Sequence, residues 1–196
     1  MRIFVAGATG VIGVRLVPLL VAAGHKVAGM TQSPDKAERL RALGAVPVVC
    51  DVFDRDGVHA AVCACHAEVV IDELTDLPDD QSRIAELAAL NARIRREGTR
   101  NLLAAAHAAG ARHFLAQSVA WELPGDGAAA VRELEQSVLA AGGIVLRYGQ
   151  FYGPGTYFEE QLPPPPRIHV DDAAARTAGA LNAPSGVVTI VEDAGS

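Results

Sequence analysis

Three glycines near the start of the chain have the spacing of a phosphate-binding turn. Gly7, Gly10 and Gly13 lie between an apolar run, Arg2–Ala6, and a segment with helical periodicity. The first glycine allows a tight turn, the second lets backbone N–H groups approach a diphosphate, and the third lets the helix pack closely on the strand. The N–H groups and dipole of the helix then face the anion. The turn predicts a dinucleotide site formed by Gly7, Ala8, Thr9, Gly10, Val11, Ile12 and Gly13.

The residues after the second apolar run bear on which dinucleotide is bound. A carboxylate at the end of this strand would accept a hydrogen bond from the ribose 2′-hydroxyl of NAD, but no acidic residue follows the run before Asp35. Thr31, Gln32 and Ser33 offer donors to a 2′-phosphate, and Lys36 offers a positive charge. The sequence therefore favours NADP, with NAD as the alternative.

Apolar runs alternate with helical patterns along the chain, which predicts parallel strands joined by helical crossovers. We expect strands at Arg2–Ala6, Lys26–Met30, Val46–Cys50, Glu68–Asp72, Arg112–Gln117, Ile144–Arg147 and Gly186–Val191. We expect helices at Thr9–Ala23, from the Ser33 cap to Gly44, and at Asp54–Cys65, Ser82–Ala109, Gly127–Ala141 and Asp171–Leu181, the last with Asp171 as N-cap and Asp172 at N1. The predicted fold class is α/β, a Rossmann-like doubly wound parallel sheet with helices on both faces, in one domain over residues 1–196.

Composition narrows the function classes. The chain has 196 residues and a net charge of −6, which argues against a nucleic-acid partner because that needs a basic face. No apolar run is long enough to span a membrane, and no leader segment is evident. Cys50, Cys63 and Cys65 form neither a disulfide framework nor a metal-ligand pattern. We expect a cytoplasmic protein without a metal site.

The spacing of the glycines, Gly-x-x-Gly-x-x-Gly, resembles that of the short-chain dehydrogenase/reductase superfamily, in its extended or atypical branch with the sugar-nucleotide epimerases and dehydratases. Further segments carry the resemblance over nearly the whole chain: Cys50-Asp51-Val52, Asn91, Glu97–Leu103, Gln117-Ser118-Val119, Leu146–Gly149, Tyr152–Gly155 and Ile168–Ala173. The resemblance implies further cofactor contacts at Asp51, Val52, Leu74, Thr75, Asn91, Gln117 and Arg147.

The catalytic pattern of that superfamily is missing. Its members use Tyr-x-x-x-Lys on a late helix, where the Lys lowers the pKa of the Tyr and the Tyr moves a proton during hydride transfer. No Tyr and no Lys occurs between Ser118 and Gly143. When Glu135 is set on the family's Glu, Val131 falls on the Lys position and Gly127 on the Tyr position.

Two explanations of this gap remain open. Another acid replaces the Tyr, with Ser118, Tyr148 and Tyr152 as the candidate catalytic residues and Glu73, Glu122 and His169 also within reach of the cleft. Alternatively, the domain binds the dinucleotide without turning it over, and the two tyrosines only wall the pocket. Asp72 and Glu73 end the fourth strand where the resemblance implies apolar or small residues, so they either face the cofactor or face solvent.

The part of the chain after the sixth strand is short. Residues 149–170 form a small lid, which favours a small organic substrate over a sugar nucleotide. We expect an NAD(P)-dependent oxidoreductase or epimerase-like enzyme with a non-standard acid. The alternatives are a catalytically silent NAD(P)-binding sensor or scaffold, and a non-redox isomerase or lyase with a structural cofactor. The resemblance also implies a homodimer through the Ser82–Ala109 and Gly127–Ala141 helices.

Overall fold

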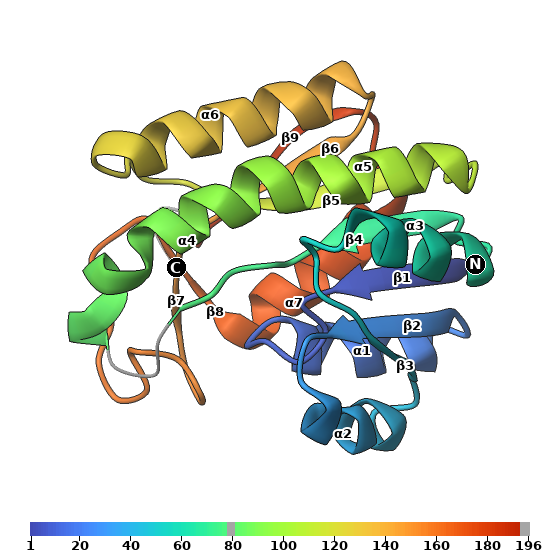
Figure 1. The fold of residues 1–196 in the computed structure, drawn as a ribbon. Coiled ribbons are helices and arrows are strands. Elements are labelled where there is room, and N and C mark those ends of the chain that lie inside the picture. Colours follow the sequence, from blue (N-terminus) through green and yellow to red (C-terminus); the bar gives the residue numbers. More distant parts are fainter. Residues whose placement is uncertain (78–80, 193–196) are drawn as a thin grey trace.

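A parallel sheet of seven strands forms the centre of the computed structural model, which describes residues 1–77 and 81–192 (Figure 1). The strand order is β3-β2-β1-β4-β5-β6-β9. The bounds are β1 (Arg2–Ala6), β2 (Lys26–Thr31), β3 (Val46–Val49), β4 (Val69–Asp72), β5 (His113–Val119), β6 (Ile144–Tyr148) and β9 (Gly186–Ile190). The predicted Rossmann-like α/β class is confirmed.

Helices cover both faces of this sheet (Figure 1). One face carries α1 (Gly13–Ala22), α2 (Ala37–Ala42) and α7 (Val170–Gly179), and the other carries α3 (Arg55–Ala64), α4 (Ala88–Arg93), α5 (Thr99–Ala108) and α6 (Gly125–Ala140). Each face has its own apolar core, and the side chains of one strand alternate between them. In β1, Ile3 enters the core beneath α1 and α7, while Phe4 enters the core beneath α3, α5 and α6.

The strand order reverses in the middle of the sheet. From β1 the chain runs outward to β3 and then returns to form β4 on the other side of β1, where Ala6 pairs with Asp72. In open α/β sheets a crevice forms beyond the carboxyl ends of the strands at such a point. Here it receives the Gly7–Gly13 turn. Two short paired strands, β7 (Gln150–Tyr152) and β8 (Arg167–His169), lie beyond the same edge, within the residues expected to form a lid (Figure 1).

The helix predicted over Ser82–Ala109 is not continuous. Gln81–Leu87 is 3₁₀, Ala88–Arg93 is α, Ile94–Gly98 is one π-helical turn, and the α-helix resumes at Thr99. None of the described side chains in the first segment is buried, so packing does not stabilise an α-helix there. At the π turn, Gly98 approaches Val52 so closely that a Cβ would lie 3.2 Å from its methyl groups.

The start of the last helix also differs from the prediction. Asp171 and Asp172 were expected at its N-cap and N1, but α7 begins at Val170 with His169 as the N-cap. The His169 Nδ1 accepts a hydrogen bond from the Asp171 N–H at 3.3 Å. The helix begins earlier because Val170 is fully buried, and the Asp171 carboxylate is left free to pair with Arg15.

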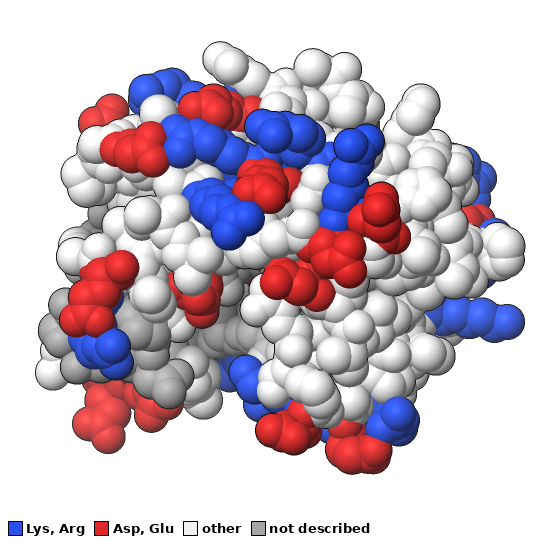
Figure 2. Space-filling view, viewed as in Figure 1, with Lys and Arg blue, Asp and Glu red and all other residues white. Residues whose placement is uncertain are grey.

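Charges on the face that carries α4, α5 and α6 are mixed, with acidic side chains lying beside the arginines (Figure 2). Arg93 pairs with Glu97, and Arg96 pairs with both Asp126 and Glu133. Within residues 1–77 and 81–192, no helix is long and apolar enough to cross a membrane, and no cluster of His, Cys, Asp or Glu is arranged to hold a metal ion.

Candidate functional site

The glycine turn has the geometry that its spacing predicts. Gly7 has a φ of +80°, and a Cβ there would lie 2.5 Å from the Glu73 carbonyl oxygen at the end of β4. A Cβ on Gly13 would collide with the Gly7 carbonyl oxygen. A Cβ on Gly10 would meet only that same oxygen, at 3.2 Å, and would otherwise point into open space. Two glycines therefore allow close packing, and the third keeps the space beside the turn free.

Backbone donors at this turn are available to an anion. Among the residues that the structure describes, none accepts a hydrogen bond from the N–H groups of Val11 and Ile12, which directly precede α1. The Ala8 N–H is used by the Met30 carbonyl of β2, which fixes the turn on the sheet. Free N–H groups at the start of a helix, with the helix dipole behind them, fit the diphosphate of a dinucleotide. The residues present therefore fit the cofactor that the sequence predicts.

The end of β2 lies beside this turn. The Thr31 side chain is buried, lies 3.3 Å from the Thr9 hydroxyl, and accepts from the Ser33 N–H. Gln32 donates to the Asp51 carboxylate at 3.2 Å, so the residues that follow β2 and β3 are in contact. Lys36 is exposed nearby. These residues line the side of the turn where the adenosine half of a dinucleotide would lie.

Two predicted cofactor contacts have structural partners. The Val52 carbonyl accepts from Asn101, which ties the segment after β3 to α5. Asn91 is buried, and its side-chain amide exchanges two hydrogen bonds with the backbone of Asp76. Asn91 thus holds the segment after β4, which contains the half-buried Leu74 and the exposed Thr75. Leu74 and Thr75 remain placed to contact a ligand at the strand edge.

Ser118, Glu135 and Arg147 form a cluster on the α6 face of the sheet. The Ser118 hydroxyl donates to Glu135 at 2.6 Å, and Arg147 donates two hydrogen bonds to the same carboxylate, at 2.8 and 2.6 Å. Burial alone would raise the pKa of Glu135, but the bonds from Arg147 and Ser118 outweigh it and lower that pKa. Glu135 is therefore a fixed anion that orients Ser118 and Arg147.

The face of α6 that carries Glu135 has no acid or base nearer the open edge of the sheet. Residues four and eight positions before Glu135 share its face of the helix, and they are Val131 and Gly127. These are the positions where the Lys and Tyr of the superfamily would lie. The structure adds that both positions lie on α6, on the helical side of Glu135.

Asp72 and Glu73 are buried rather than solvated, with exposures of 3% and 6%. The two side chains point to opposite faces of the sheet. Asp72 accepts from the Thr99 hydroxyl at 2.8 Å and from the Leu74 N–H at 3.2 Å. Burial raises the pKa of Asp72 to about 6, against the effect of these two hydrogen bonds.

Glu73 shares a buried network with Tyr148 and Thr177. The Tyr148 hydroxyl lies 2.8 Å from Glu73 Oε1 and 2.6 Å from the Thr177 hydroxyl, which also contacts the Ala173 carbonyl at 2.8 Å. Each of these three hydrogen bonds needs its own hydrogen atom, and the hydroxyls of Tyr148 and Thr177 supply only two. A protonated Glu73 supplies the third, and burial raises the pKa of Glu73 to about 8.

Tyr148 and Tyr152 are both engaged, and neither lies with Ser118. Tyr148 is 2% exposed in the core beneath α7, on the opposite face of the sheet from Ser118. Tyr152 donates to Glu192, which also pairs with Arg167 of β8. The bond to Glu192 raises the pKa of Tyr152. The structure therefore does not bring the three candidate catalytic residues together.

Comparison with known proteins agrees with this geometry. The model of a family described as NAD(P)H-binding matches residues 7–141, which is more than half of the chain. The chain therefore belongs to the NAD(P)H-binding family. Within it, a curated relative from Streptomyces, 3-diazoavenalumate denitrifying reductase, is 36% identical over 236 aligned positions that cover 98% of this chain and 76% of the relative.

Solved structures share the fold of this NAD(P)H-binding protein at low identity. UDP-glucose 4-epimerase of Thermus thermophilus, solved with NAD, superposes with a TM-score of 0.78 at 21% identity, over 97% of this chain and 78% of the epimerase. ChuY of Escherichia coli O157:H7, an anaerobillin reductase, gives 0.73 at 20% identity and covers both chains fully. The resemblance to the extended or atypical short-chain dehydrogenase/reductases is thereby confirmed. The family match and the reductase relative support a nicotinamide dinucleotide as the cofactor and an NAD(P)-dependent enzyme role in general.

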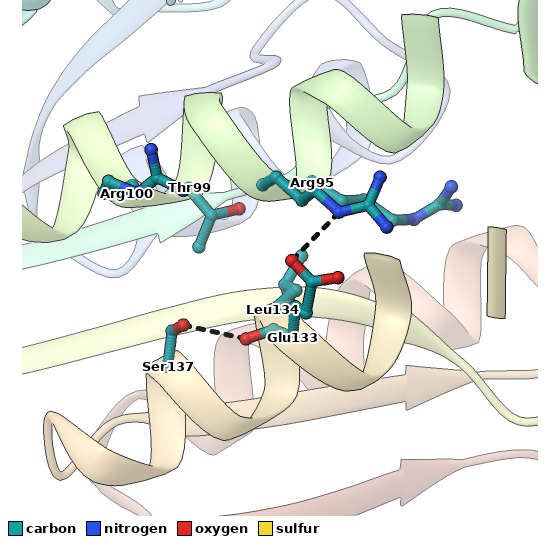
Figure 3. A pocket seen from close by; sticks show the side chains of 7 residues that line it. Arg95, Thr99, Arg100, Glu133, Leu134 and Ser137 are labelled. Atoms are coloured by element: carbon teal, nitrogen blue, oxygen red, sulfur yellow. Dashed lines mark hydrogen bonds and ion pairs between the residues drawn. The ribbon is translucent and has the colours of Figure 1, made fainter. Parts of the chain in front are cut away.

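Arg95 differs from the exposed arginines on the same helical segment, Arg93 and Arg100. Arg95 is half-buried and its charge interacts with that of Asp72, beside a small pocket between α5 and α6 (Figure 3). The signal that could have separated it is its spacing of four from both Asn91 and Thr99, which are buried.

Proposed function

We propose that this protein is an NADPH-dependent reductase that delivers hydride to a small electrophile whose reduction needs no proton from the enzyme. The observation that carries the proposal is the face of α6. An intact glycine turn lies beside a helix that presents Val131 and Gly127 where an acid and its partner would be. Reduced nicotinamide, when bound, supplies a hydride from its C4 carbon.

An aromatic diazo compound fits this requirement. An arenediazonium cation and one hydride give the arene and N₂, so the hydride supplies the new C–H bond, the nitrogen leaves, and no proton is consumed. The name of the Streptomyces relative describes a reductase that removes nitrogen from a diazo carboxylate. A carbonyl substrate would instead leave an alkoxide, which needs the missing acid.

The chain's own residues bind and orient in this scheme. The N–H groups of Val11 and Ile12 bind the diphosphate, and the segment Thr31–Ser33 with Lys36 receives the 2′-phosphate that distinguishes NADPH. Glu135 fixes the Ser118 hydroxyl and Arg147 at the floor of the nicotinamide end. The lid strands β7 and β8 cover a small substrate.

The proposal is tested by following NADPH absorbance with 4-carboxybenzenediazonium, against the rate without protein. Because no proton is needed, Tyr148→Phe and Tyr152→Phe are expected to keep most of the enzymatic rate, whereas loss of a true general acid costs about 100-fold or more. Ser118→Ala tests the remaining candidate in the same assay. A loss of that size in any of the three, with cofactor binding intact, would favour a replacement acid. Tight NADPH binding without any hydride transfer would instead favour a sensor or scaffold.

Cofactor choice has its own test. Lys36→Gln removes the only side-chain cation of the segment between β2 and α2. It should weaken NADPH binding by about tenfold while leaving NADH unchanged, since only NADPH carries the 2′-phosphate. Calorimetry with both nucleotides measures this. Equal effects on NADPH and NADH binding would show that Lys36 does not contact the 2′-phosphate.

A further inference from the structure

Arg95 lies on the helical face that looks onto the end of β4. Asn91, Arg95 and Thr99 are four residues apart, so they follow one side of the helical segment. Asn91 bonds to the backbone of Asp76, and Thr99 bonds to the Asp72 carboxylate. Both flanking residues therefore contact the segment that leaves β4, and Arg95 lies between them. Figure 3 shows Arg95 and Thr99 on one helical segment, with Glu133 and Leu134 of α6 opposite.

The Arg95 guanidinium is half-buried and unpaired. Within the described residues 1–77 and 81–192, it makes no hydrogen bond and no ion pair, whereas its neighbours Arg93 and Arg96 are each paired with carboxylates. Burial lowers the pKa of Arg95, and only the charge of Asp72 acts against this. Partly desolvated arginines are normally paired, so an unpaired one is positioned for an anion that arrives from outside.

Two carboxylates lie near Arg95, and neither is paired with it. Glu133 of α6 lines the same pocket but accepts a hydrogen bond from Arg96 at 2.9 Å. Asp72 is already bonded by the Thr99 hydroxyl and the Leu74 N–H, and its pKa is raised to about 6 by burial. The residues one and two turns before Glu135 on α6, Val131 and Gly127, carry no charge. The π-helical turn Ile94–Gly98, a local departure of the kind often found at functional sites, holds Arg95 in this position.

We propose that Arg95 binds a carboxylate of the substrate and so selects anionic aromatic substrates over neutral ones. This rests on the proposed function, because it places the substrate between α6 and the end of β4. The planar guanidinium donates two parallel hydrogen bonds to a carboxylate, which fixes the orientation of the substrate as well as its charge. The residue supplies a positive charge on the wall opposite the empty Lys position, without supplying a proton.

A pair of ligands that differ only in charge tests the assignment without turnover. Calorimetry with NADP⁺-loaded protein compares cinnamate with cinnamamide. Cinnamate is expected to bind about tenfold or more tightly, the effect of one charged bidentate pair. Arg95→Gln should abolish this preference, and Arg95→Lys should restore only part of it, because a lysine cannot form the bidentate pair. Arg39→Gln, an exposed arginine of α2 on the other face of the sheet, is the control and should keep the preference.

The results separate this inference from the function on which it rests. Cinnamate preference that depends on Arg95, in a protein that transfers no hydride, would uphold the anion site and reject the reductase. Hydride transfer with unchanged cinnamate affinity in both Arg95 variants, whose unfolding temperatures match that of the unmodified protein, would overturn the anion site. Should Arg95→Gln fail to fold, Arg95→Lys alone decides by its change in the cinnamate-to-cinnamamide ratio.

Discussion

Gly10 and Gly13 lie in one turn but meet different surroundings. A Cβ on Gly13 would lie within 2.6 Å of three atoms of the backbone, whereas one on Gly10 would point into the space beside the turn. Gly13→Ala should therefore destabilise the fold, by about 1–3 kcal/mol as in other overpacked sites. Gly10→Ala should leave unfolding nearly unchanged and weaken NADPH binding about tenfold or more. Urea titration and calorimetry on both variants measure this, and equal losses of stability would contradict the assignment.

Glu73 makes stability depend on pH. Burial raises its pKa from 4.5 to about 8. Between these two pH values the folded protein therefore binds a proton that the unfolded chain has lost. The free energy of unfolding should fall as pH rises above 4.5, by at most about 1.4 kcal/mol per unit, and level off near pH 8. Asp72 adds a smaller fall in the free energy of unfolding between pH 3.8 and about pH 6.

The matched variant is Glu73→Gln, which keeps the size and shape of the side chain but has no carboxyl group to titrate. Urea unfolding from pH 7 to pH 9 isolates the part that belongs to Glu73, because Asp72, with a folded pKa of about 6, is then largely ionised in both states. The unmodified protein should lose stability across this range, and the variant should lose much less. Parallel curves would show that Glu73 is ionised in the folded protein at neutral pH.

Single residues differ in how far the sequence alone could place them. The glycine turn was predictable because the positions of its first and last glycines are set by local steric limits, where a Cβ would collide with nearby backbone atoms. The burial of Asp72 and Glu73 was not, because their partners Thr99 and Tyr148 come from distant segments. The half-buried place of Arg95 was only partly predictable, because its spacing of four from Asn91 and Thr99 marks the helical side but not the π-helical turn that orients it.

At the scale of elements, Arg15 joins the glycine turn to the lid. From the first turns of α1 it donates to the Val11 carbonyl, to the Pro154 carbonyl of the lid and to Asp171 of α7. Arg15→Gln should free the lid, so backbone amides of residues 150–169 should exchange at least about fivefold faster, as for loss of about 1 kcal/mol.

Hydrogen exchange by mass spectrometry measures this effect. Arg112→Gln is the control, because it breaks only the pair with Glu68 at the opposite end of the sheet. It should leave the lid unchanged. Lid exchange that is the same in both variants would mean that Arg15 does not hold it.

Element types followed from periodicity more securely than element ends did. All seven strands of the main sheet were expected near where they lie. The break in the long helix depends on Gly98 packing against Val52, and the start of α7 depends on the His169 cap. Both are tertiary or side-chain effects that hydrophobic spacing does not encode.

At the scale of the whole molecule, we propose a homodimer formed by the α4–α5 segment and α6. Ser137 lies on the exposed side of α6. Light scattering should give twice the mass of one chain, and Ser137→Arg should give the mass of one chain with unchanged circular dichroism. A single-chain mass for the unmodified protein at tens of micromolar would exclude this arrangement.

The central claim is that the glycine turn holds NADPH and that hydride leaves it without an acid from the protein. Deuterium transfer tests this most directly, with NADPH labelled at C4 and 4-carboxybenzenediazonium as the acceptor. We expect deuterium on the carbon that lost nitrogen and one N₂ for each cofactor oxidised. The transfer rate should be lost in Gly10→Ala but kept in Tyr148→Phe and Tyr152→Phe. Oxidation of the cofactor no faster than without protein would contradict it.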